Sequence, residues 1–168
     1  MPAAFRLYLL RHARAAWAQP DQTDFERTLD DVGYADAEIV ADKAADRGFV
    51  PALVLCSTAE RCRQTIEPFR RTMGEELDIQ FLDTLYTGAF DEYHSLISGN
   101  GNVSSLMVVG HNPAIQEVFF SLVGTTTAQG AAPKGFLPGM LAIIEFDTPP
   151  ETTTSGNGKL AALISASS

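Results

Sequence analysis

The chain has 168 residues, of which 45% are hydrophobic and 20% charged, and its formal net charge at pH 7 is −9. This size and composition fit one globular domain over residues 1–168. They argue against a general nucleic-acid binder, because a phosphate backbone requires clustered cations and the twelve Lys and Arg residues are spread along the chain. No apolar run approaches the roughly eighteen residues of a membrane span, so we expect neither a nucleic-acid partner nor a membrane partner.

The N-terminal sequence and the cysteine content indicate the compartment. Arg11, His12 and Arg14 follow the first apolar stretch, where a secretion signal would carry a small-residue cleavage site. The two cysteines, Cys56 and Cys62, are too few for a disulfide framework. We therefore expect a cytoplasmic protein.

Short apolar runs alternate along the chain with segments of helical spacing. In chain order, the pattern predicts a strand over Phe5–Leu10, a helix over Gly33–Arg47, a strand over Ala52–Cys56, a helix over Ala59–Met73, a strand over Asp78–Leu82, a helix over Asp91–Ile97, a strand over Leu106–Val109, a helix over Pro113–Val123, and paired strands over Leu141–Phe146 and Leu160–Ile164. This alternation predicts an α/β fold of three layers, α/β/α, with a mainly parallel central sheet.

Three positions carry more specific expectations. Pro68 predicts a kink in the second helix or a break into two helices. Asn112 is suited to the N-cap of the fourth helix, with Pro113 at its first position. The loop Pro149–Gly158 is rich in Thr and Gly, and we expect it to be mobile.

Polar side chains follow three of the predicted strands, where α/β sheets bind their ligands. The segments are Arg11-His12, Ser57–Arg63 and His111-Asn112. Together they would supply imidazoles, arginines and a helix N-terminus, which are the groups that stabilise a phosphoryl group in transfer. A neutral imidazole can attack phosphorus, and nearby arginines keep it neutral by disfavouring its charged form. His12 meets this requirement.

The same segments carry a family resemblance. Leu9–Ala13 resembles the Arg-His signature of the histidine phosphatase superfamily, and Ala13 followed by Arg14 is similar to its small SixA-type phosphohistidine phosphatases. Ser57–Arg61 with Thr65 resembles the second motif of the family, and Val109–Pro113 the third. Three such motifs in order, each after a predicted strand, form a strong joint signal. Further matches to the SixA type are Asp24, Arg27 and Lys134–Gly139.

The resemblance implies a phosphoglycerate-mutase-like fold, no cofactor and no metal. It implies that His12 is the phosphorylated nucleophile. It assigns Arg11 and Arg61 to the phosphoryl oxygens and makes His111 a further donor. The lesser phosphate-binding positions that it implies are Arg14, Ser57 and Asn112.

One departure from the family bears on the substrate. Members that act on alkyl phosphates usually offer a carboxylic acid where this chain has Thr87. An alkoxide leaving group needs a proton, whereas imidazole, with a pKa of about 6.5, is a far better leaving group. Thr87 therefore favours a phosphohistidine substrate. Asp83, Asp91 and Glu92 stay open as proton donors, although a surface carboxylate is the commoner role for each.

The spacing between the motifs bears on access to the site. About fifty residues separate Arg61 from His111, and at usual loop lengths the predicted elements leave little of them for a lid. An open cationic cleft admits a side chain of a folded protein. We therefore expect a phosphorylated-protein substrate.

Competing classes stay open at this point. His12, His94 and His111 could serve a metallohydrolase, but they lack the spacing of known zinc motifs. Cys56 precedes Arg61 by one residue too few for the loop of a cysteine phosphatase, and a core position suits this cysteine better. The remaining alternatives are a small phosphomonoesterase of the same family and a phosphate-binding or protein-interaction module without turnover.

Overall fold

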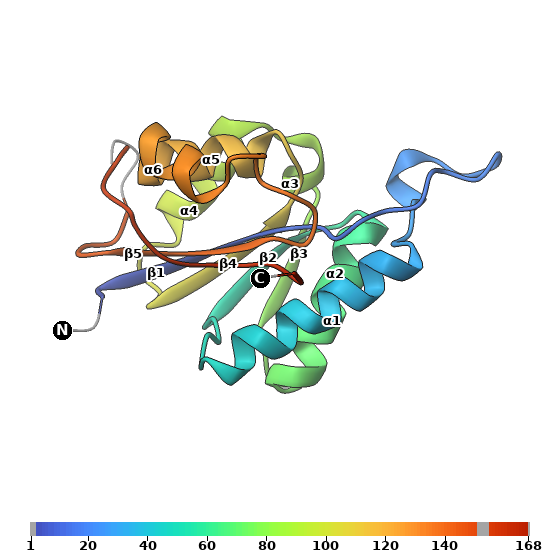
Figure 1. Ribbon diagram of the computed structural model, residues 1–168, viewed down its shortest axis with the longest axis horizontal. Helices are drawn as coiled ribbons and strands as arrows, with labels where there is room; N and C mark the ends of the chain where they lie inside the picture. Colours follow the sequence, from blue (N-terminus) through green and yellow to red (C-terminus); the bar gives the residue numbers. More distant parts are fainter. Residues whose placement is uncertain (1–2, 151–154, 168) are drawn as a thin grey trace.

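The computed structural model describes residues 3–150 and 155–167, which are arranged around a six-stranded sheet (Figure 1). In chain order the elements are β1 (Phe5–Arg11), the 3-10 helix η1 (Asp24–Glu26), α1 (Asp31–Asp46), β2 (Leu53–Ser57), α2 (Glu60–Met73), β3 (Ile79–Leu82), α3 (Thr84–Thr87), α4 (Phe90–Gly99), β4 (Ser105–Gly110), α5 (Ala114–Val123), α6 (Thr125–Ala131), β5 (Leu141–Phe146) and β6 (Lys159–Ile164).

The strands lie in the order β3-β2-β4-β1-β5-β6. The four strands from β3 to β1 are mutually parallel, while β5 runs antiparallel to β1 and β6 antiparallel to β5. In this register the carboxyl ends of β1, β2 and β4 meet at one edge, since Arg11 pairs with Gly110 and Cys56 with Val109. The mainly parallel sheet is as predicted.

Helices cover both faces of the sheet (Figure 1). Leu7 and Leu9 of β1 join one core cluster with Phe119 of α5, together with residues of α3, α4 and α6. Tyr8 and Leu10 join the opposite cluster, which includes residues of α1 and α2. Because both faces are covered, the central strands read as continuous apolar runs. The predicted three-layer α/β/α architecture is confirmed.

The predicted strands are all found, with ends that differ by at most one residue. Of the two outcomes predicted at Pro68, the break into two helices is wrong, because α2 continues through the proline as one helix, while the kink stays a prediction. Phe69 lies beyond the proline and is fully buried in the core. The free energy gained by this packing offsets the loss of the helix hydrogen bond that proline cannot donate.

The predicted N-cap at Asn112 is also wrong, because α5 begins at Ala114 and its N-cap is Pro113, after a cis peptide bond. Asn112, one residue before the N-cap, still hydrogen-bonds to the first turn of the helix. Its Oδ1 accepts a hydrogen bond from the N–H of Gln116 at 3.2 Å, and its Nδ2 donates to the carbonyl of Phe136 at 2.9 Å. Asn112 thereby ties the start of α5 to the segment before β5.

Residues 151–154 of the loop Pro149–Gly158 lie outside the described residues, so the mobility of this loop stays a prediction. In the described part of the chain, no helix combines the length and the apolar character that crossing a membrane requires.

Candidate active site

His12 follows β1 at the edge where the carboxyl ends of the parallel strands meet. Its main-chain N–H donates to the carbonyl of Gly110 at 3.0 Å. Its ring Nδ1 lies 2.8 Å from the carbonyl oxygen of Ala13. Because a carbonyl only accepts, Nδ1 carries the proton, and the neutral ring therefore keeps the lone pair on Nε2.

A buried threonine locks this turn to α2. The N–H of Ala13 donates to Oγ1 of Thr65 at 3.0 Å, and the hydroxyl of Thr65 donates to the carbonyl of Arg61 at 2.7 Å. Thr65 and Ala13 are both fully buried. The residue that follows His12 is thus fixed relative to the first turn of α2.

His111 follows β4, and its ring centroid lies 5.2 Å from that of His12. Nε2 of His111 lies 2.8 Å from Oγ of Ser57, which also accepts from the N–H of Ala59 at 3.2 Å. Nδ1 of His111 lies 3.4 Å from Nη2 of Arg61. Because a guanidinium only donates, Nδ1 of His111 accepts from Arg61, and Nε2–H donates to the Ser57 hydroxyl. The same hydroxyl can also donate, so it could support the other neutral tautomer of His111.

Both imidazoles are held in their neutral form. Burial lowers the pKa of His12 to about 3, against the opposing hydrogen bond to Ala13, and the charges of His111, Arg61 and Arg11 lower it further. Burial also lowers the pKa of His111 to about 4, with Arg61 acting in the same direction. A neutral imidazole is a nucleophile, whereas an imidazolium is not.

Arg61 and Arg11 bring positive charge to the two histidines. Arg61 lies in the first turn of α2 and is 7% exposed. Burial lowers the pKa of Arg11, whose Nη1 donates to the carbonyl of Phe136 at 2.9 Å. The Nε–H groups of both arginines are buried without an acceptor in the part of the chain that the structure describes. Unsatisfied guanidinium donors are suited to an anion.

Asp24 and Tyr86 complete the surroundings of Arg61. The carbonyl of Asp24 accepts from Nη1 of Arg61 at 2.8 Å and its Oδ2 from Nη2 at 3.2 Å. Although burial acts to raise the pKa of Asp24, hydrogen bonds from Tyr86 and Arg27 and the charge of Arg61 lower it to about 2. The ring of Tyr86 meets that of His111 edge-on at 5.6 Å.

These two residues were only partly visible in the sequence. Only the resemblance to the SixA type pointed to Asp24, and no sequence signal assigned a role to Tyr86. The signal that could have found Tyr86 was its place beside Thr87, at the expected position of the carboxylic acid.

The structure separates the lesser predicted positions. The histidine cluster consists of His12 and His111 with Arg11 and Arg61, and Ser57 belongs to it because its hydroxyl contacts His111. Asn112 instead hydrogen-bonds to Gln116 and Phe136. Arg14 is not brought into the cluster: its side chain is 59% exposed, and its Nε donates to Asp30 at 2.5 Å.

The position of Thr87 offers no carboxylic acid. The hydroxyl of Thr87 donates to the carbonyl of Asp83 at 3.2 Å. Oδ1 of Asp83 accepts from Thr58, the neighbour of Ser57, at 2.6 Å. Asp83 is therefore hydrogen-bonded directly to the second motif. Glu92 has a different role, because its Oε1 accepts from the N–H of Ala89, the N-cap of α4.

The competing chemistries gain nothing from the described side chains. Burial raises the pKa of the Cys56 thiol and raises that of Cys62 to about 12, so neither supplies a thiolate. His94 stacks on Phe90 of α4 at 5.6 Å. Among the described residues, no group of three or more His, Cys, Asp or Glu side chains is placed to hold a metal ion.

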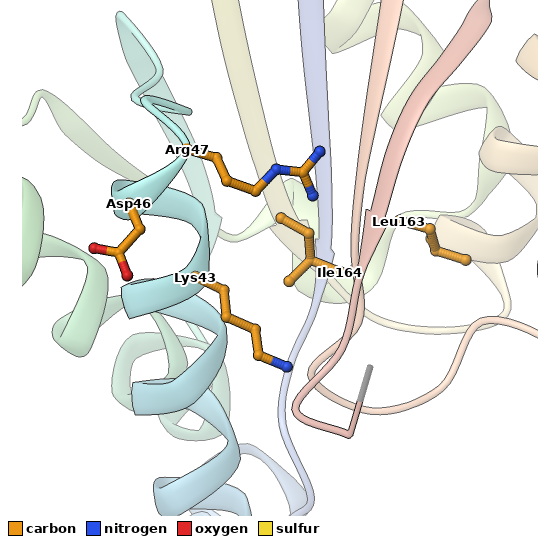
Figure 2. A pocket seen from close by; sticks show the side chains of 5 residues that line it. All are labelled: Lys43, Asp46, Arg47, Leu163 and Ile164. Carbon is orange, nitrogen blue, oxygen red and sulfur yellow. The ribbon is translucent and has the colours of Figure 1, made fainter.

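A hollow elsewhere on the molecule is lined by neither histidine nor cysteine. It has a volume of about 470 Å³ and lies between the C-terminal part of α1 and the end of β6 (Figure 2). Its lining residues are Lys43, Asp46, Arg47, Leu163 and Ile164. Nζ of Lys43 donates to the carbonyls of Ser165 and Ala166 at 3.0 and 3.2 Å. This hollow shares no residue with the histidine cluster.

Comparison with known proteins places the chain in a family. Residues 7–98 match the histidine phosphatase superfamily (branch 1). An uncharacterised protein of Mycobacterium tuberculosis is 35% identical over 126 residues, which cover 71% of this chain and 75% of that protein. An uncharacterised chloroplastic protein of Arabidopsis thaliana is 30% identical over 131 residues, and the match spans 72% of this chain but only 60% of that relative. The chain belongs to the histidine phosphatase superfamily.

Within the superfamily, solved structures point to the SixA type. A candidate SixA phosphohistidine phosphatase from Agrobacterium tumefaciens is 39% identical, with a TM-score of 0.86 over 98% of both chains. A protein histidine phosphatase SixA complexed with tungstate has a TM-score of 0.77 over 97% of this chain and 98% of that one, but at 22% identity it shows the fold alone. These similarities confirm the phosphoglycerate-mutase-like fold and support a phosphatase of the SixA type.

Proposed function

We propose that the protein is a phosphohistidine phosphatase in which Nε2 of His12 attacks the phosphoryl group of its substrate. The observation that carries this proposal is the hydrogen bond from Nδ1–H of His12 to the carbonyl of Ala13. Together with the lowered pKa of His12, it leaves an uncharged ring whose free lone pair is on Nε2. The remaining groups of the cluster supply positive charge and N–H donors.

The first step forms a bond from Nε2 of His12 to phosphorus and breaks the bond from phosphorus to the substrate imidazole. When the second ring nitrogen of the substrate already carries a proton, the imidazole leaves as a neutral molecule and needs no acid. In the second step water attacks phosphorus, the bond from phosphorus to Nε2 of His12 breaks, and both protons of the water depart on the phosphate. Because Nδ1 of His12 keeps its proton on the Ala13 carbonyl, His12 also leaves neutral.

Three side chains would stabilise the transferring group. Arg11 and Arg61 would bind its oxygens through guanidinium donors. His111 would donate from Nδ1 once a phosphoryl oxygen lies between it and Arg61, with its Nε2 then accepting from the Ser57 hydroxyl. Spreading the phosphoryl charge over fixed donors is the main contribution that a protein makes to this chemistry.

The phosphoryl group would come from a histidine of another protein. Thr87 supplies no carboxylic acid for an alkoxide, which disfavours alkyl phosphates. Between β3 and β4 the described chain holds only the short helices α3 and α4, whose residues pack on the sheet, so this part of the site carries no lid. Such a substrate would be met in the cytoplasm, which stays the expected location.

The test is hydrolysis of free phosphohistidine and p-nitrophenyl phosphate by the native protein and by His12→Ala. We expect turnover of phosphohistidine by the native protein only, and a ³²P-labelled intermediate that is stable in alkali and labile in acid. Absence of turnover with both substrates would leave a phosphate-binding module. Hydrolysis of p-nitrophenyl phosphate without hydrolysis of phosphohistidine would identify a small phosphomonoesterase instead.

A further inference from the structure

Trp17 is the single tryptophan of the chain, and it is 84% exposed. It lies on an excursion, residues 14–30, between β1 and α1. Figure 1 shows this segment in blue, extending away from the sheet and beyond the ends of α1 and α2. Tryptophan is highly buried on average in folded proteins, and it is enriched at protein–protein interfaces.

The excursion is tied at its base by main-chain hydrogen bonds. The N–H of Ala16 donates to the carbonyl of Thr28 at 2.8 Å, and the N–H of Asp30 donates to the carbonyl of Arg14 at 3.1 Å. The N–H of Leu29 donates to a side chain of α2 at 2.8 Å. The backbone that presents Trp17 is therefore held in place before any partner arrives.

Arg27 positions the indole ring itself. Its guanidinium carbon lies 5.1 Å from the centroid of the Trp17 ring. The same guanidinium is fixed on two sides, since its Nε donates to the carbonyl of Ala16 at 2.9 Å and its Nη1 to Oδ1 of Asp24 at 3.1 Å. A ring held by a cation–π contact loses little conformational freedom on binding, which favours affinity.

The excursion is continuous with the phosphoryl site. Asp24 contacts Arg27 through Oδ1 and Arg61 through Oδ2. Phe25, 38% exposed, meets the ring of Tyr86 edge-on at 5.0 Å, and Tyr86 in turn meets His111. A protein that presents a phosphorylated side chain to this site would therefore lie beside the excursion.

We infer that Trp17 is the main docking contact for the protein that carries the phosphohistidine, and that it binds an apolar patch beside the phosphorylated side chain. This inference rests on the proposed function. An anionic membrane surface is a poorer fit, because residues 16–22 contain no Lys or Arg and include an aspartate. Trp17 would thus recognise the protein, while the histidines and arginines of the site would recognise the phosphoryl group.

The kinetic test compares two substrates: free phosphohistidine, and a small helical protein without tryptophan whose single histidine is phosphorylated with phosphoramidate. For Trp17→Ala we expect kcat/KM on the phosphoprotein to fall about tenfold or more, through KM, because truncation of a hot-spot aromatic has effects of this size. The rate on free phosphohistidine should change less than twofold. Trp17→Phe should recover part of the loss. Val50→Ala, at a 46% exposed apolar position before β2, is the matched control.

Equal changes on both substrates, or no change on either, would overturn the docking inference while the proposed function stands. A native protein that hydrolyses neither substrate would overturn the proposed function. In that case tryptophan emission still tests the inference, because Trp17 is its only source. In His12→Ala, the phosphoprotein should shift the emission to shorter wavelength and free phosphohistidine should not. A shift with anionic phospholipid vesicles, or on concentrating the chain alone, would assign Trp17 to a membrane or to a second copy and overturn the inference.

Discussion

The two neutral histidines of the cluster predict a loss of stability in mild acid. The pKa values of His12 and His111 are about 3 and about 4 in the folded protein, against about 6.5 in an unfolded chain. Their folded pKa is lowered, so the unfolded state binds more protons as pH falls below 6.5. Stability is therefore complete above pH 6.5 and decreases below it.

The size of the effect follows from the same values. At pH 5 each unfolded histidine gains about 2 kcal/mol from protonation that the folded ring cannot gain, so both together lower the free energy of unfolding by at most about 4 kcal/mol. Carboxylates contribute little to this interval, because their unfolded pKa values are near 4.

Urea unfolding at pH 7.5 and pH 5.0 measures this difference. His12→Asn and His111→Asn should each remove about half of the loss, and the double variant most of it. His94→Asn, outside the cluster, controls for the removal of a titratable ring. Our reasoning would be refuted if the double variant lost as much stability between the two pH values as the native protein.

Three further substitutions test single contacts of the site. Ser57→Ala removes the partner of Nε2 of His111 and should lower kcat on phosphohistidine about tenfold with little change in KM, in steady-state kinetics. Thr65→Val leaves the buried N–H of Ala13 without its acceptor, so thermal or urea unfolding should show a loss of about 1–3 kcal/mol. Thr87→Glu introduces the carboxylic acid that members acting on alkyl phosphates usually offer, and it should raise activity on alkyl phosphates but not on phosphohistidine. An unchanged ratio of the two rates would remove Thr87 as the reason for the substrate preference.

The sheet and the histidine cluster could be predicted because their signals are local. Buried parallel strands are short apolar runs, and the residue after each strand lies at a shared edge whatever the loops do. His12 and His111 thus follow from strand ends alone. Helix α6 (Thr125–Ala131) could not be predicted, because its Thr and Gly residues give no apolar periodicity.

The parts of the site that sequence reasoning missed depend on tertiary contacts. Asp24 reaches Arg61 only because the excursion returns to α2, and no periodicity marks that path. Arg14 occupies the expected position after the motif, yet Asp30 across the excursion binds it. A motif therefore identified which residues were present more reliably than where their side chains would point.

The hydrogen bond between Nδ1 of His12 and the carbonyl of Ala13 has a consequence for how this site can vary. Many reactive histidines depend on a separate carboxylate, which one substitution removes. Here the orienting group belongs to the peptide backbone of the next residue, so a change of side chain at position 13 does not delete it. What position 13 must supply is a small volume, since Ala13 is fully buried. The small side chain of Ala13 is thus compatible with this orientation of the nucleophile.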